Sequence, residues 1–234
     1  MNPRRAWLLG GIAFCLVAAQ AALGPSLGGL LRRAIEGRAT ELAALEVRVA
    51  PVNWLDLFSG RIRRVEIQAQ QISFGGPRFA LLAMDLREIS LSPRALFLHG
   101  EAAVRALGPS RVVARIEEEA LNDYCRRAYP NLPVQVRVGG GRVGLTGRLS
   151  LFGHELSFST SGRLQAAGGD RLRYVPEEIE AAGKRLPASW LAAYGENLAL
   201  EFPLEIPLPL VLREIRAAEG HLQLILEESA AARP

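Results

Sequence analysis

Residues 134–158 read VQVRVGGGRVGLTGRLSLFGHELSF, and this stretch decides the fold class. Apolar residues alternate with polar ones on both sides of three consecutive glycines: Val134, Val136, Val138, Val143, Leu145. Because successive side chains of a strand point to opposite faces, this period of two predicts strands with one buried face. The glycines Gly139 to Gly141 are typical of a tight turn between two such strands. The stretch therefore predicts an antiparallel meander.

The same alternation recurs along the rest of the chain. It covers residues 45–49, 62–67, 86–91, 111–116, 198–212 and 222–226. Its one-residue slips predict bulges in long, twisted strands. Prolines lie within the run 198–212 on its polar parity, at positions 203, 207 and 209. Because proline cannot donate to a ladder, we predict that this run is an edge strand or a bulged one.

Two segments have helical periodicity instead. In residues 26–45 the apolar residues recur at helical spacing opposite the cations, which predicts an amphipathic helix: Leu27, Leu30, Leu31, Ile35, Leu42. A second helix is predicted from Glu117, where three glutamates suit the positive end of the helix dipole, to just before Pro130. Its apolar stripe contains Leu121, Tyr124, Cys125 and Ala128. Residues 52–60, 93–98 and 186–195 are interpreted as short helical turns.

The N-terminal segment predicts targeting to a membrane. Arg4 and Arg5 precede an uncharged stretch, residues 6–31, which is rich in apolar residues. Residues 19–21, Ala-Gln-Ala, fit signal-peptide cleavage, but the stretch also reaches the roughly 20 residues that span a bilayer. Both interpretations remain open, and each places the following residues outside the cytoplasm. We therefore divide the chain into a signal peptide or anchor (1–24), one domain (25–229) and a tail (230–234), and expect it in the cell envelope.

Composition excludes several classes of function. The formal net charge is only +4, from 28 basic and 24 acidic residues, which is too mild for a nucleic-acid-binding surface. Local arginine pairs such as Arg32-Arg33 and Arg126-Arg127 suit either a solvated face or anionic lipid headgroups. Three scattered histidines and two cysteines predict no metal site. Cys125 is the only cysteine after the leader, so the exported part forms no internal disulfide.

The surrounding sequence contradicts each candidate catalytic motif. Gly139, Gly141 and Gly144 match the spacing of a dinucleotide-binding loop, but the period of two that follows excludes the helix which that loop requires. Glu117, Glu118 and Glu119 point in different directions on a helix, so we interpret them as solvated acids of the first turn. We predict no catalytic residue, no metal and no cofactor.

The glycine placement and hydrophobic rhythm resemble one known family. Leu121-Asn122, the glycine turn, the Leu-Pro run over 204–210 and Gly220-x-Leu222-x-Leu224 resemble the LmeA-like phospholipid-binding family of bacterial envelope proteins. Residues 60–67 fit its upstream pattern of a glycine followed by alternating aliphatic residues. The resemblance implies an α+β fold in which a long, strongly curved antiparallel sheet wraps around a helix, as in tubular lipid-binding proteins. It also implies an exported protein that binds phospholipid.

Our first hypothesis is therefore an envelope protein that holds phospholipid, or another acyl lipid, in an apolar groove formed by the curved sheet and the 27–42 helix. From their apolar position, eight residues are predicted to contact the lipid: Leu31, Ile35, Trp54, Leu57, Phe58, Leu121, Tyr124, Trp190. Two alternatives remain open. One is an interaction or scaffold protein with a filled core, and the other is an accessory of envelope lipid or glycan assembly that uses Glu117 to Glu119 or His154.

Overall fold

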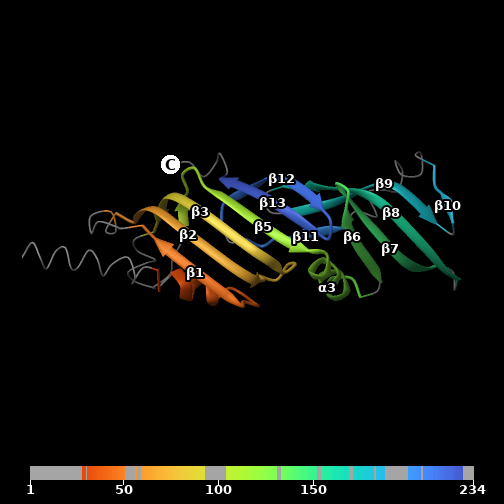
Figure 1. Ribbon diagram of the computed structural model, residues 1–234, viewed down its shortest axis with the longest axis horizontal. Coiled ribbons are helices and arrows are strands. Elements are labelled where there is room, and N and C mark those ends of the chain that lie inside the picture. The colour runs from red at the N-terminus through yellow and green to blue at the C-terminus, as the bar shows by residue number, and fades with distance from the viewer. Residues whose placement is uncertain are drawn as a thin grey trace, which may run out of the picture.

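The protein is an elongated α+β molecule built mainly from antiparallel strands (Figure 1). Its computed structural model describes residues 28–29, 31–50, 56, 59–92, 104–130, 133–151, 154–168, 171–181, 183–187, 200–206 and 208–228. The predicted leader, 1–24, and the tail, 230–234, lie outside the described residues. Within the described part, no helix combines the length and the apolarity needed to cross a membrane.

The strands are divided between two sheets, which lie end to end (Figure 1). In spatial order, the first sheet contains β1 (Ala44–Val49), β2 (Arg61–Ile72), β3 (Phe79–Leu91), β5 (Arg111–Glu117), β13 (His221–Glu228) and β12 (Leu210–Ala218), with β4 (Val104–Ala106) beside β3. The second contains β10 (Lys184–Arg185), β9 (Arg171–Ala181), β8 (His154–Ala166), β7 (Arg142–Leu151) and β6 (Val134–Gly139), with β11 (Glu201–Pro203) beside β9. Helix α3 (Glu118–Ala128) follows β5 and leads into β6.

The second sheet confirms the predicted meander. Strands β6, β7, β8 and β9 pair in chain order, each antiparallel to the next. The turn between β6 and β7 contains Gly140 and Gly141, whose φ angles are +59° and +76°. Positive φ at both central residues is what a tight hairpin turn requires and what glycine adopts without strain. The dinucleotide-like spacing is therefore a hairpin, as predicted.

The slips in hydrophobic alternation correspond to irregular pairing between β2 and β3. Ile62 pairs with Ile89 and Arg64 with Arg87, so Arg63 and Glu88 fall between two regular pairs. Glu88 has a φ of +47° at this point. In each strand, the buried side chains on either side of this point are therefore three positions apart instead of two, and both point to the buried face.

The proline-containing run is not one strand. Among the described residues from 200 to 218, strand structure occurs in β11 and β12, and residues 204–206 between them are irregular. A proline within the run removes a ladder donor, which explains why the alternation does not give a continuous strand. The prediction is confirmed for β12, which lies at the edge of its sheet and has a register shift between Leu212 and Glu214.

The amphipathic helix is shorter than predicted. Residues 28–29 and 31–36 are helical, and the backbone N–H of Gly37 closes the last turn on the carbonyl of Arg33. Thr40 already donates to the carbonyl of Ser73, at the end of the neighbouring strand. Leu42 therefore belongs to the extended segment before β1, because pairing with the sheet replaces further helical hydrogen bonds.

Helix α3 confirms the second predicted helix. Glu118 and Glu119 occupy its first turn and Arg126 and Arg127 its last, as the helix dipole favours. Leu121 and Cys125 of the predicted apolar stripe are buried, whereas Ala128 is exposed at the C-terminal end.

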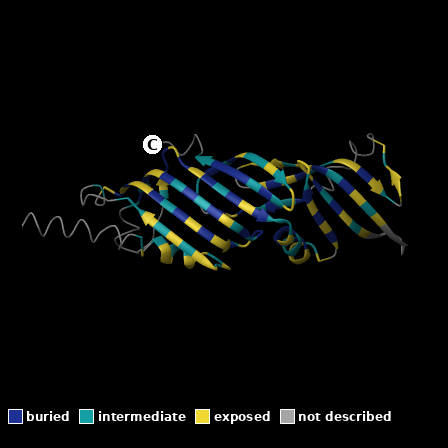
Figure 2. Cartoon of the chain, in the orientation of Figure 1, coloured by how far each residue is buried: buried dark blue, intermediate teal, exposed yellow. Residues whose placement is uncertain are grey.

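A continuous hydrophobic core extends through both sheets. Figure 2 shows buried and exposed residues alternating along β2 and β3. The largest fully buried side chains in the second half are Tyr174 of β9 and Phe202 of β11. The ring of Tyr124 on α3 packs at 5.8 Å from that of Phe202, measured between centroids.

Burial makes Cys125 chemically inert. Its side chain is fully buried, and desolvation raises the pKa of its thiol to about 11. At pH 8 only about one thiol in a thousand is then the reactive thiolate. We expect iodoacetamide to leave Cys125 unlabelled in native protein lacking residues 1–24, and to label it fully in guanidinium chloride. Rapid labelling of the native protein would contradict this burial.

Candidate functional site

An apolar cavity of about 300 Å³ lies between the 31–36 helix and the inner face of the first sheet. This volume is at the lower end of the roughly 300–1,000 Å³ range typical of small-molecule sites. Strands β2 and β3 form most of its wall, and the helix covers it.

The wall consists of the inward-pointing residues of β2 and β3. Those residues are aliphatic or methionine: Ile62, Val65, Ile67, Ala69, Ile72, Leu82, Met84, Leu86, Ile89, Leu91. The spacing within each strand is two, except at the slip described above and between Ala69 and Ile72, where Gln71 has a φ of +52°. Without the irregular pairing at Arg63 and Glu88, the residues beyond it would point to the solvent side. This irregularity, which affects both strands equally and leaves their register unchanged, therefore keeps the wall apolar along its length.

The helix covers the cavity with its apolar side. Leu31, Ala34 and Ile35 line the cavity and are partly buried against the core. Phe74, Val104 and Leu208 complete the lining from the β2–β3 turn, β4 and the segment before β12. Among the described residues, the helix contributes three apolar side chains to the lining, and the cavity remains between them and the sheet.

Two arginines are the charged residues among those that line the cavity. Arg33 lies in the helix and Arg38 directly after it, and both are exposed. The described lining contains no aspartate or glutamate. The cavity thus combines an apolar interior with a cationic rim.

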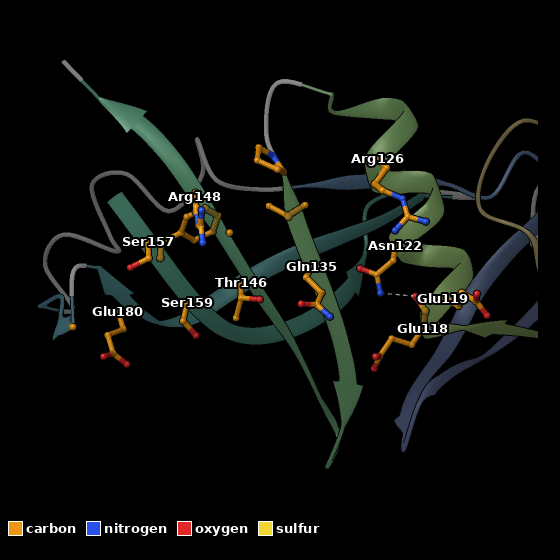
Figure 3. Close-up of a pocket in the computed structure, with 15 residues that line it drawn as sticks. Glu118, Glu119, Asn122, Arg126, Gln135, Thr146, Arg148, Ser157, Ser159 and Glu180 are labelled. Atoms are coloured by element: carbon orange, nitrogen blue, oxygen red, sulfur yellow. Dashed lines mark hydrogen bonds between the residues drawn. The ribbon is translucent and has the colours of Figure 1, made fainter. Parts of the chain in front are cut away.

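A second concavity, the polar hollow, lies between α3 and the second sheet (Figure 3). Its volume is about 1,300 Å³, and it is shallow and open. Polar side chains dominate its lining: Glu118, Glu119, Asn122, Arg126, Gln135, Thr146, Arg148, Ser157, Ser159, Glu180.

Two side chains of the polar hollow join α3 to the outer edge of β6. The amide of Asn122 donates to the carbonyls of Val136 and Glu118, both at 2.9 Å, and accepts from the N–H of Val136 at 2.7 Å. A carboxylate oxygen of Glu118 accepts from the N–H of Val138 at 2.8 Å. These bonds satisfy polar groups on an edge of β6 that pairs with no further strand among the described residues.

Further bonds continue this junction between the sheets. Gly220, in the β12–β13 turn, donates to the carbonyl of Val138, and Gly141 donates to the carbonyl of Ala217. Gly76 of the β2–β3 turn lies so close to β11 that an added Cβ would be 2.2 Å from the carbonyl oxygen of Pro203. These contacts hold the two sheets together on two sides. Among the described acids of the polar hollow, Glu118 has a structural role, because its carboxylate accepts the bond from β6.

The interpretation of Glu118 as a solvated acid is wrong, because its carboxylate accepts the bond from β6. Glu117 instead forms an ion pair with Arg115, at 2.8 Å. Glu119 is exposed. Glu118 and Glu119 both line the polar hollow, whereas Glu117 is not among its lining residues. No group of three potential metal ligands occurs in the described part of the chain.

The structure brings together two of the eight predicted lipid-contacting residues, Leu31 and Ile35, at the apolar cavity. Leu121 and Tyr124 lie on α3, where Leu121 is fully buried in the core and Tyr124 packs on Phe202. Trp54, Leu57, Phe58 and Trp190 lie outside the described residues, as does the side chain of His154.

Sequence reasoning did not single out the wall of β2 and β3, although its alternation was visible. It also missed Arg33 and Arg38 as cavity residues and Asn122 as the link to β6. The adjacent residues Leu121 and Asn122 could have indicated this link. The side chain of Leu121 is buried, and that of Asn122 accepts a hydrogen bond from the edge of β6.

Comparison with known proteins identifies a family for the chain. No curated protein and no solved structure shows significant similarity to the chain. The profile of LmeA-like phospholipid-binding proteins, however, matches residues 19–227, which include both sheets, α3 and the apolar cavity. Since this match covers most of the sequence, the chain belongs to the LmeA-like phospholipid-binding family.

Proposed function

We propose that this protein is an exported or membrane-anchored envelope protein that binds a phospholipid with an acyl chain in the apolar cavity. The observation that carries the proposal is the cavity itself, with its wall of ten apolar side chains from β2 and β3 and its helical cover. Family membership supports phospholipid as the ligand. In this proposal the first sheet curls around the helix as one half of a tubular lipid-binding fold.

Burial of hydrocarbon supplies the affinity. Each methylene group removed from water contributes about 0.8 kcal/mol, so several carbons suffice for stable binding without any directional contact. The cavity volume of about 300 Å³ suits part of a lipid rather than a whole one. The headgroup then lies at the rim, where water and the exposed arginines are present.

The predicted leader supports the proposed location. Its apolar stretch ends next to the residues that cover the cavity, so an uncleaved anchor would hold the cover close to the outer surface of the membrane. A lipid could then pass between bilayer and cavity over a short distance. If the leader is cleaved, the same domain would carry lipid through the envelope.

Native mass spectrometry with lipid extraction tests the proposed function. For protein lacking residues 1–24 and purified from a bacterial host, we expect co-purifying phospholipid at a defined stoichiometry, or its uptake when added after delipidation. The headgroup class is identified from the extract.

A mass corresponding to protein alone, with no uptake of added phospholipid or fatty acid, would contradict the proposal. That result would favour the interaction or scaffold protein, for which the filled core of the second sheet provides a rigid platform.

A further inference from the structure

Two arginines that line the apolar cavity, Arg33 and Arg38, have no acidic partner among the described residues. Arg33 and Arg38 are exposed, and both contribute to the cavity lining. Ion pairs are common elsewhere on the described surface, as between Arg64 and Asp85 at 2.8 Å. Arginine at a rim of this kind offers a planar set of donors that matches phosphate oxygens.

The neighbouring Arg32 shows that this arrangement is specific to the cavity side of the helix. Its Nε lies 2.7 Å from a carboxylate oxygen of Glu36, one turn further along, and Arg32 does not line the cavity. The same short segment thus contains one arginine that is neutralised on the outside and two that are available at the rim.

The charge of the rim also distinguishes between headgroups. A zwitterionic phospholipid adds an ammonium group beside its phosphate, and the described lining offers this cation neither a carboxylate nor an aromatic face other than Phe74. A headgroup with net negative charge brings no such cation to the two arginines.

We infer that Arg33 and Arg38 bind the headgroup phosphate and select phospholipids of net negative charge. This inference rests on the proposed function, because the acyl chain must occupy the cavity for its phosphate to reach the rim. The lipid is thereby oriented, with its chain between β2, β3 and the helix and its phosphate beside Arg33 and Arg38.

Three lipids with identical chains test the inference: dimyristoyl phosphatidylglycerol, dimyristoyl phosphatidylcholine and dimyristoylglycerol. We expect the wild-type protein to take up phosphatidylglycerol about tenfold more tightly than phosphatidylcholine, an effect typical of charge-assisted hydrogen bonds at a hydrated site. The variant R33Q/R38Q is expected to lose this preference and to keep its affinity for dimyristoylglycerol. The matched control R32Q removes one positive charge from the same helix and is expected to keep the preference.

The outcomes separate the inference from the function on which it rests. If wild type and R33Q/R38Q bind all three lipids alike, the inference is wrong and lipid binding stands. If neither protein takes up any of the three, both the inference and the proposed function are wrong. If glycerol phosphate alone binds as tightly as phosphatidylglycerol, the arginines form an anion site unrelated to the cavity, which also overturns the inference.

Discussion

Replacing Ala69 by phenylalanine is expected to abolish phospholipid uptake while the protein stays folded. Ala69 is fully buried, lines the cavity and has the smallest side chain of the β2 wall. The new ring would enter space that is otherwise available to an acyl chain. Displacing as few as two methylene groups costs about 1.6 kcal/mol, which is more than a tenfold loss in affinity. Lipid titration monitored by native mass spectrometry measures the effect.

The matched control is Ala83→Phe, which makes the same change on the other face of the sheet. Ala83 lies on β3, pairs with Gln68 and is not among the cavity-lining residues. The Ala83→Phe variant should bind lipid with the affinity of the wild-type protein. Because the cavity has room for the ring, the melting temperature of Ala69→Phe should equal or exceed that of the wild type. Undiminished lipid uptake by a folded Ala69→Phe variant would show that the chain binds elsewhere.

Replacing Asn122 by alanine is expected to destabilise the protein by about 2–4 kcal/mol, since two backbone groups of Val136 lose their partner at once. The amide group of Asn122 is half-buried between α3 and β6, where water replaces it incompletely. Equilibrium unfolding in urea, followed by circular dichroism, gives the change in free energy. Loss of the link also exposes the edge of β6, so we expect aggregation to increase.

Asp123→Ala provides the comparison for Asn122→Ala. Asp123 is the next residue of α3, and its side chain forms an ion pair with Arg126 on the helix surface. Exposed pairs of this kind contribute about 0–1 kcal/mol, so the loss should be small. Equal destabilisation by the two substitutions would contradict a role of Asn122 in holding α3 to β6, since alanine is the better helix former and its helix propensity alone would not lower stability.

The meander and its hairpin were predictable because the information is local. The alternation over 134–158 and the consecutive glycines determine strand, turn and register within a few residues, and the structure has the predicted β6–β7 hairpin. Helix α3 was predictable for the same reason, from the spacing of Leu121 and Cys125 and from the charges at its two ends.

The division into two sheets was not predictable, because it depends on contacts between distant segments. One partner of β5 is β13, more than a hundred residues later, and the hydrogen bond from Gly220 to Val138 joins the sheets between residues that are also far apart in sequence. The helix boundary at Gly37 is another example. Helical spacing continues to Leu42, but pairing of Thr40 with Ser73 ends the helix earlier.

The candidate site was predictable in part. Apolar position indicated Leu31 and Ile35, which lie at the cavity, but it indicated Leu121 and Tyr124 equally, and these pack in the core. Periodicity shows which side chains are buried. It does not show whether the space in front of them is filled, because that depends on the segment that packs opposite.

Photo-crosslinking with a phospholipid that carries a diazirine in its acyl chain tests the central claim most directly. After irradiation of the complex and proteolysis, the account predicts labelled peptides from residues 61–72 and 79–91 and from the 31–36 helix, with no labelling of these peptides in Ala69→Phe. Labelling confined to α3 and the polar hollow, or to the second sheet, would contradict an acyl chain in the apolar cavity.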